Sequence, residues 1–573
     1  MSAPGAPPTY QLSGAEFDSL GSGYGSPSAL ATLRSAQLSK RLLLLSAAHR
    51  GPGLDGAAWQ VLRDLTAHRP DIAGDVLGHP FVDTWATRYL RSAGTPSVSP
   101  GYVSGLAVAA AVRAGVDLDL PITGHTGELY IPTVGLAYGL GDGPVTVRLR
   151  DGDLTVSGTD TTVRVPAPYT EDRPGWCVSR GFTARSAAGP LTLAIEDLDP
   201  HRACFGHMVA PRLRADEASR FESLVGRAWR IIATDFPEHA VAIAGCLRAI
   251  VPLVSPASGS VSGSSQTAFG AVGVSTPDDP AVLALLLIHE TQHVKLGAVI
   301  DHAPMYDPAG DGVHHAPWRA DPRPARALFQ GVYAHLGVAD FWRVRRTRTA
   351  GDKVRTADFE FAYWLAQTRL AARALAGSGE LTAHGERFVD RLTATLDGWA
   401  AAPAGDALAA GVDDLVTAVA VRWRLDNHRP EPETAAALAA AWLAGQPCPP
   451  LDPPPVAPAK LGGPARTDGL ADHLRARLTG TTAPAPAPGD TAYLEGRWPA
   501  ALSAYRRAAI DVPDDPLAWI GLALAVRAGG APDGARALAE RPDLVRATYL
   551  RLRAAGRTAA PDELAAWLAA GLG

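Results

Sequence analysis

Residues 281–293 constrain the fold more than any other stretch, because an unbroken apolar run leads directly into His289-Glu290-Thr291-Gln292-His293. The run Ala-Val-Leu-Ala-Leu-Leu-Leu consists mostly of helix formers, which predicts one buried helix that carries both histidines. At 3.6 residues per turn, His293 falls about 40° from His289, so the two imidazoles share a helix face. Two imidazoles at this spacing can bind one divalent metal ion.

Glu290 and Gln292 flank the histidine pair on the predicted helix. We expect Glu290 to reach a metal-bound water or a second ligand, and Gln292 to contact a bound cofactor. The alternative is a chance His-Glu-x-x-His on an ordinary amphipathic helix. Burying two imidazoles and a carboxylate in an otherwise apolar helix is costly without a metal ion, so the pattern favours a metal site.

The charge balance argues against nucleic acid and membranes as partners. The chain has 573 residues, a formal net charge of -5 and no polybasic stretch. The early apolar burst Leu42-Leu43-Leu44-Leu45 is too short for a signal peptide or a membrane span. The four cysteines form no Cys-x-x-Cys pair, which predicts a reducing cytoplasm and neither a disulfide scaffold nor a zinc-cysteine module.

The pattern of apolar residues predicts an α+β protein that is mostly helical. Helical spacing dominates, but a central stretch alternates apolar and polar residues in the manner of short hairpin strands. A proline-rich stretch then precedes a helical tail. The expected parts are a mobile N-terminus 1–28, a helical region 29–118, a β-rich subdomain 119–205, a metal-binding catalytic domain 206–445, a linker 446–490 and a tail 491–573.

The tail is similar to the tetratricopeptide pattern. The residues with the matching offsets are Gly496, Ala501, Tyr505, Ala508, Pro513, Trp519, Leu522 and Ala535. Small residues would let paired helices approach closely, while the aromatic rings fill the seam between them. A generic alanine-rich helical hairpin is the alternative, because fewer than three repeats rarely fold alone. Either structure would serve packing or an interaction with a maturation partner.

A third protein ligand is required, because two histidines leave a metal ion under-coordinated. The downstream candidates are His302, His314, His315, His335 and Glu360. We expect His302 to point away near the helix end, and His314 and His315 lie in a loop rich in Gly, Asp and Pro. His335 is preferred because it lies in a helical run whose flanking glycines would permit close approach to the first helix. Glu360 is the second choice and would complete a peptidase-like zinc site, while a hydrogen-bonded core histidine is the alternative reading of His335.

Two further segments indicate how a substrate and a cosubstrate would be held. Residues 264–274 alternate like a strand, and their place before the metal helix resembles the edge strand on which zinc peptidases align substrates. An ordinary hairpin strand is the alternative. Arg319 and Arg323 lie in a proline-stiffened loop, and an arginine side chain binds both oxygens of a carboxylate.

Four segments together resemble the HExxH-domain family of actinobacterial peptide-maturation clusters: residues 36–44, 289–298, 317–324 and 330–336. Members of that family are iron(II)- and 2-oxoglutarate-dependent peptide β-hydroxylases. The likeness runs from about residue 29 to residue 375 and covers neither the linker nor the tail. It implies a zincin-like metal helix, with Fe(II), 2-oxoglutarate and O2 as cofactors and a ribosomally made precursor peptide as the substrate.

Two enzyme hypotheses use the same helix. In the first, His289, His293 and His335 hold Fe(II), an arginine near Arg319 or Arg323 clamps 2-oxoglutarate, and a peptide side chain is hydroxylated. In the second, the metal ion is zinc and Glu290 is the general base of a peptidase. A third hypothesis is a catalytically inactive scaffold that presents peptide through its tail. The family resemblance favours the oxygenase.

Overall fold

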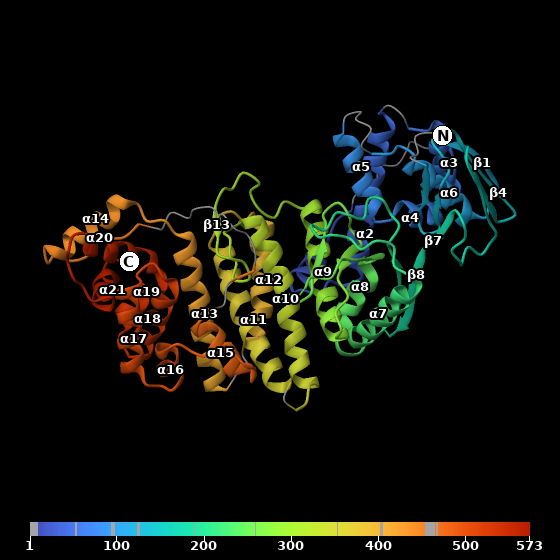
Figure 1. Ribbon diagram of the computed structural model, residues 1–573. Coiled ribbons are helices and arrows are strands. Elements are labelled where there is room, and N and C mark those ends of the chain that lie inside the picture. The colour runs from blue at the N-terminus through green and yellow to red at the C-terminus, as the bar shows by residue number, and fades with distance from the viewer. Residues whose placement is uncertain are drawn as a thin grey trace. The chain divides into compact units, whose positions relative to one another are not determined.

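The computed structural model describes residues 10–572 except 52–53, 93–97, 123–126, 188, 258, 352, 401–404, 453–463 and 466–467. Helices predominate in this described part, which has 21 helices and 14 short strands, so the predicted α+β, mostly helical class is confirmed (Figure 1). The chain divides into two compact units, residues 1–304 and 305–573. Each unit is described by itself below.

The first unit begins with six helices: α1 (Gly14–Gly21), α2 (Pro27–His49), α3 (Gly56–His68), α4 (Pro70–Leu77), α5 (Phe81–Arg91) and α6 (Tyr102–Ala114). Helix α1 lies where the sequence predicted a mobile N-terminus. Two contacts that the sequence did not reveal explain the difference. Ser13 and Glu16 form a reciprocal capping box at the start of α1. The Lys295 Nζ then donates hydrogen bonds to the carbonyls of Gly23 (2.6 Å) and Tyr24 (2.9 Å).

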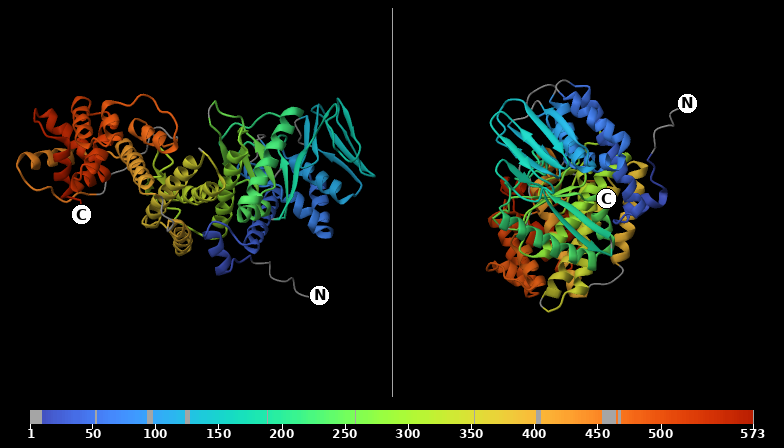
Figure 2. Two further views of the ribbon diagram at one scale, coloured as in Figure 1. Left: turned by 90° about the horizontal axis from the view of Figure 1, so that it is seen from below. Right: turned by 90° about the vertical axis from the view of Figure 1, so that its right-hand side faces the viewer.

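Two small sheets form the first part of the predicted β-rich subdomain 119–205, whose strands after residue 178 join a different sheet. Strands β1 (Leu118–Ile122), β4 (Val145–Arg150), β5 (Asp153–Ser157) and β6 (Thr162–Val165) pair antiparallel in the order β1-β4-β5-β6. Strands β2 (Glu128–Ile131), β3 (Gly135–Tyr138) and β7 (Trp176–Val178) form the other sheet. Alternate residues of β1 and β4 are buried, and helices α3 and α6 pack on this side (Figure 2).

A five-stranded mixed sheet supports the helix that carries His289 and His293. Its order is β11 (Ser262–Ser264), β12 (Ala271–Val274), β10 (Ala249–Pro252), β9 (Gly189–Ile195) and β8 (Arg180–Ser186). Strands β12, β10 and β9 run parallel, while β11 and β8 pair antiparallel with their neighbours. The single strand predicted over 264–274 is thus two strands joined by a turn, and the edge strand is β11. Helices α7 (Ala215–Asp235) and α8 (Pro237–Cys246) contact α9 (Pro280–His302), which also contacts β11 and β12.

The second unit contains the remaining elements. They are β13 (Val313–His314), β14 (Arg323–Pro324), α10 (Ala325–Arg348), α11 (Lys353–Ala376), α12 (Ala383–Ala400), α13 (Asp406–Asn427), α14 (Pro432–Leu443), α15 (Leu470–Thr479), α16 (Pro488–Leu494), α17 (Trp498–Asp511), α18 (Pro516–Ala528), α19 (Pro532–Glu540), α20 (Pro542–Ala554) and α21 (Pro561–Ala569). The unit boundary falls directly after α9 and therefore inside the predicted catalytic domain 206–445. Helix α15 lies inside the predicted linker.

The tail is not separated from the helices before it. One apolar core joins Phe359 of α11 and Leu415 of α13 to Trp519 and Leu538 of the tail. Helix α18 packs against α13, and α15 packs against both α11 and α13. Proline content alone predicted a linker over residues that include α15. The helix packs there nevertheless, because burial of the apolar residues Leu470 and Leu474 outweighs the local proline signal.

Tyr505 fills the seam between α17 and α18, as the sequence pattern predicted for an aromatic ring at this position. Its hydroxyl donates to Asp490 (2.6 Å), and its ring lies so close to Gly521 that a Cβ there would be 2.1 Å from the ring. The Trp519 Nε1 donates to the carbonyl of Pro513 (2.8 Å). Because the Tyr505 ring leaves no space for a Cβ, the close contact of the two helices requires glycine at position 521.

We predict that Gly521→Ala destabilises the second unit by about 1–3 kcal/mol, because the added methyl group cannot fit against Tyr505. Thermal unfolding followed by circular dichroism measures the change. Gly398→Ala is the matched control, since a Cβ at this position of α12 meets nothing within 4 Å. It should raise stability slightly, because alanine favours a helix over glycine by about 0.5–1 kcal/mol. Equal melting temperatures for the two variants would contradict the packing argument.

Candidate functional site

Helix α9 presents the predicted motif. Asp279 caps its first turn by accepting a hydrogen bond from the backbone N–H of Ala281 (2.8 Å), and Pro280 occupies a first-turn position where no N–H is needed. By length and composition alone α9 could cross a membrane, but 72% of its most apolar window is buried inside the protein. This burial is that of a core helix, as the apolar run predicted.

His289 and His293 are neighbours on one face of α9. Their ring centroids are 4.9 Å apart, with the rings at 78° to each other. Both side chains are partly exposed, whereas Glu290, Thr291 and Gln292 between them are buried. Burial lowers the pKa of His289 to about 4, with Glu290 opposing the shift and His293 adding to it. The His289 imidazole is therefore neutral at pH 7, the form in which it can bind a metal ion.

Glu290 is held by the edge strand. The Ser262 Oγ of β11 donates a hydrogen bond of 2.6 Å to Glu290 Oε1, and the same oxygen lies 3.9 Å from His289 Nε2. Only 3% of Glu290 is exposed. The carboxylate is thus fixed beside the histidine pair by a residue that lies just before the segment predicted as a strand. Ser262 is a site residue that the sequence reasoning missed, because a serine in a Ser/Gly run carries no distinctive signal.

Gln292 is 1% exposed, and neither atom of its side-chain amide has a hydrogen-bond partner among the described residues. A buried amide without a partner costs free energy. Thr291, by contrast, satisfies its hydroxyl by donating to the carbonyl of Leu287 (2.7 Å). The predicted cofactor contact of Gln292 stays a prediction.

His335, the predicted third ligand, belongs to the second unit. Its Nδ1 lies 2.8 Å from the carbonyl oxygen of Gly331, and its ring stacks on Trp318 at 3.9 Å between centroids. Nδ1 donating to a backbone carbonyl would leave Nε2 as the metal-binding nitrogen. The flanking glycines were expected to permit close approach to the helix that carries His289. For Gly331 this expectation is corrected, because a Cβ there would be 2.3 Å from Trp318. Gly331 therefore makes room for the indole ring.

Arg319 and Arg323 share one carboxylate. Arg319 contacts Asp321 Oδ1 at 2.7 and 2.8 Å, and Arg323 contacts Asp321 Oδ2 at 3.0 Å. Burial opposes ionisation of Asp321, but Arg323 and Arg319 outweigh it and lower the pKa of this carboxyl group. A cosubstrate carboxylate would bind these arginines in competition with Asp321. Asp321 stood in the predicted loop, but the sequence gave no reason to assign it a role.

Three of the other ligand candidates, Glu360, His314 and His315, lie in the second unit. Glu360 accepts hydrogen bonds from Trp364 Nε1 (2.9 Å) and from Arg475, and burial raises its pKa. His314 pairs with Glu380 at 2.8 Å. The His315 ring lies 4.7 Å from that of Trp423, and burial lowers the pKa of His315 to about 3.

Metal binding by three side chains is not established by the geometry. Among the described residues, no group of three or more His, Cys, Asp or Glu side chains is arranged to hold a metal ion. The donor chemistry of the His289–His293 pair fits a divalent metal, since both imidazoles lie on one face and one is neutral at pH 7. The identity of the third ligand stays a prediction.

Lys295 of α9 is another residue whose importance was not predicted from the sequence. It is fully buried, and its Nζ donates to the backbone carbonyls that follow α1. Burial lowers the pKa of Lys295 to about 7, with nearby Cys246 opposing the shift. The signal was visible in the sequence, because a lysine directly after the histidine motif continues the buried helix and must find acceptors there.

A buried polar network lies at the end of β9, in the run Glu196-Asp197-Leu198-Asp199. His79 lies 3.4 Å from Glu196 and 3.7 Å from Asp199. Tyr130 donates to Glu196 (2.8 Å), and Tyr102 donates to Asp199 (2.9 Å). Burial raises the pKa of Asp199 to about 7, with His79 opposing the shift and Glu196 adding to it. Three acids within four residues after an apolar strand were a sequence signal for such a network.

No known family model matches the sequence, and no curated protein matches it either.

We predict that Asp199→Asn becomes more stable relative to the natural protein as pH rises from 5 to 8. The folded pKa of Asp199, about 7, lies above its ordinary value of 3.8. The stabilisation from its bound proton is therefore complete below about pH 4 and is lost as pH rises through 7, whereas asparagine cannot ionise. Melting temperatures measured at each pH should separate by roughly 2–4 °C.

The exposed Asp142→Asn, which makes the same substitution away from this buried network, is the control for this comparison. An Asp199→Asn difference that does not change with pH would contradict the raised pKa.

Proposed function

We propose that the protein is an Fe(II)- and 2-oxoglutarate-dependent hydroxylase that acts on a side chain of a ribosomally made precursor peptide. The observation that carries the proposal is the His289–His293 pair, partly exposed on one face of a mostly buried helix. With iron bound, 2-oxoglutarate and O2 would supply the oxidising chemistry. The family resemblance favours this metal and this cosubstrate, and a cytoplasmic location is part of the same proposal.

The residues of this chain would bind and orient the reactants. His289 and His293 would hold the metal ion, with His335 as the proposed third ligand. Ser262 holds Glu290 beside the pair, so the carboxylate can orient a group at the metal without leaving its hydrogen bond. Arg319 and Arg323, which a ligand carboxylate would bind in competition with Asp321, are the proposed clamp for the distal carboxylate of 2-oxoglutarate.

Strand β11 is the proposed position of the peptide. It is the last strand of its sheet and contacts the metal helix. A peptide that paired with it would satisfy backbone hydrogen bonds and bring a side chain towards the histidines. The edge strand, the sheet and α9 together are the basis for proposing a zincin-like catalytic unit. The paired helices α16–α21 are likewise the basis for proposing a tetratricopeptide-like tail that binds a maturation partner.

A zinc peptidase is the second candidate function. The placement of Glu290 Oε1 3.9 Å from His289 Nε2 favours it specifically, because a general base must reach a metal-bound water. Both candidates need the same histidines. They differ in what Glu290 does, and this difference can be measured.

We predict that anaerobically purified protein binds Fe(II) and that His289→Ala and His293→Ala each lose it while keeping the fold. Loss of one of two imidazoles removes the chelate, and neither side chain is fully buried. Iron titration and circular dichroism measure the two properties. His302→Ala, at the end of the same helix, is the matched control and should retain iron.

The same titration tests the third ligand. His335→Ala should lose iron, and Glu360→Ala should retain it. Iron loss in Glu360→Ala with retention in His335→Ala would exchange the two roles. Full activity of His293→Ala would overturn the metal assignment.

We predict that Glu290→Gln retains measurable succinate formation from 2-oxoglutarate, because oxidative chemistry at iron needs no general base at Glu290. In a zinc peptidase the same change would remove the base and most of the rate, about 100-fold or more. Succinate release and peptide cleavage are measured in parallel by mass spectrometry. Ser262→Ala controls for the position of the carboxylate, which it frees without removing it. Peptide cleavage by the natural protein that disappears in Glu290→Gln would establish the peptidase instead.

A further inference from the structure

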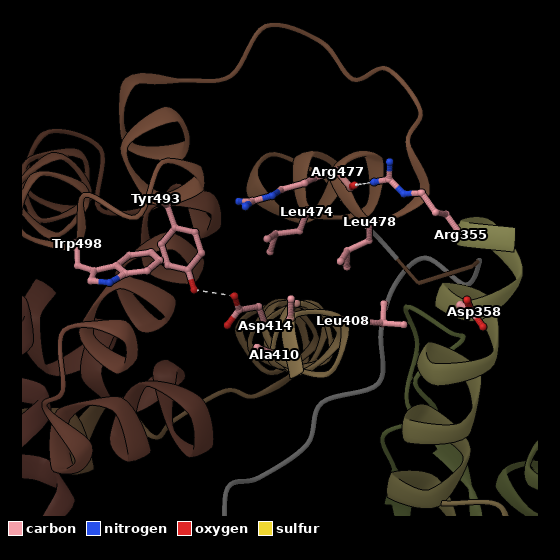
Figure 3. Close-up of a pocket in the computed structure, with 12 residues that line it drawn as sticks. Arg355, Asp358, Leu408, Ala410, Asp414, Leu474, Arg477, Leu478, Tyr493 and Trp498 are labelled. Carbon is pink, nitrogen blue, oxygen red and sulfur yellow. Dashed lines mark hydrogen bonds between the residues drawn. The ribbon is translucent and has the colours of Figure 1, made fainter. Parts of the chain in front are cut away.

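A groove of about 450 Å³ lies within the second unit, between helices far apart in the sequence (Figure 3). Helix α13 forms one wall, α15 lies opposite, α11 closes one end and α16 with the start of α17 closes the other. Every lining residue belongs to a helix, so no strand edge is available to pair with a ligand's backbone. Anything that binds here must be recognised through side chains.

The floor of the groove is apolar. Leu478 of α15 and Leu408 of α13 are partly exposed here, while Leu474, beside Leu478, is buried in the core (Figure 3). Gly411 permits the close approach of Leu478, because a Cβ there would be 2.8 Å from this side chain. At one end Trp498 is 36% exposed, an unusual exposure for an indole ring. A ligand that covered this floor would remove apolar surface from water.

The charges at the groove are unbalanced. The two acids that line it are neutralised within the protein: Asp358 pairs with Arg346 at 3.2 Å, and Asp414 binds Arg527 and the Tyr493 hydroxyl. The two arginines that line it, by contrast, donate only to backbone carbonyls in the described part of the chain. Arg355 donates to the carbonyl of Arg477 (2.7 Å), and Arg477 donates to that of Leu494 (2.7 Å).

We propose that this groove binds an amphipathic helical peptide whose leucine-like side chains cover the apolar floor and whose carboxylates pair with Arg355 and Arg477. A helical ligand satisfies its own backbone hydrogen bonds, which a groove lined only by helices cannot do for it. Charge complementarity selects acidic side chains next to the apolar ones. The groove lies wholly within the second unit, and this docking function does not depend on the metal chemistry proposed for α9.

The test uses the full-length protein and two labelled probe peptides. Both carry leucine at positions i, i+3, i+4 and i+7, with glutamate between them in one probe and lysine in the other. Fluorescence anisotropy should show micromolar binding of the glutamate peptide, which weakens as salt is raised. Arg355→Gln combined with Arg477→Gln should weaken it at least tenfold. Both arginines are exposed, so the double variant should keep its fold.

The matched control removes two other exposed arginines, Arg551→Gln with Arg557→Gln, and should leave the affinity within twofold. Leu478→Glu, which places a carboxylate on the floor, should abolish binding of the glutamate peptide. Three results would overturn the proposal: equal affinity for the lysine peptide, unchanged affinity in the Arg355/Arg477 double variant, or binding of decanoate without binding of either peptide.

Discussion

The burial of polar groups along α9 is the constraint on which the first unit depends. A helix this apolar belongs in a core, yet it carries Glu290, Thr291 and Lys295 into that core. An unpaired charge in such surroundings would cost several kcal/mol. The protein satisfies the two charged groups from different segments: Ser262 of the edge strand binds Glu290, and the carbonyls of Gly23 and Tyr24 bind Lys295. Helix α9 therefore ties together the N-terminal segment and the five-stranded sheet.

The same demand for partners shapes the rest of the chain. In the first unit, Tyr130 and Tyr102 bind Glu196 and Asp199 after β9, and His79 lies beside both acids. In the second unit, carboxylates such as Asp321 bind more than one cation-bearing side chain. Two other places in the structure suit a ligand. The His289–His293 pair suits a metal ion, and Arg355 with Arg477 suits the carboxylates of a peptide. The two proposals rest on separate units and can fail independently.

Part of the candidate site could be predicted from sequence, because its signal is local. The helix, the shared face of His289 and His293 and the burial of Glu290 follow from 3.6 residues per turn and an apolar run. The roles of His335, Arg319 and Arg323 could not be derived in this way. His335 stacks on Trp318, and both arginines bind Asp321, but no periodicity reveals which side chains meet in a loop.

The sequence by itself determined the mostly helical α+β class, the β-rich stretch and the shared face of His289 and His293 on α9, since each depends on the spacing of residues close together in the chain. Only the tertiary structure decided the unit boundary after α9, the edge position of β11 and the joining of the tail to α11 and α13 in one core. These features depend on contacts between residues far apart in the chain. Local propensity cannot encode them, because burial against a distant partner outweighs a proline-rich or glycine-rich composition.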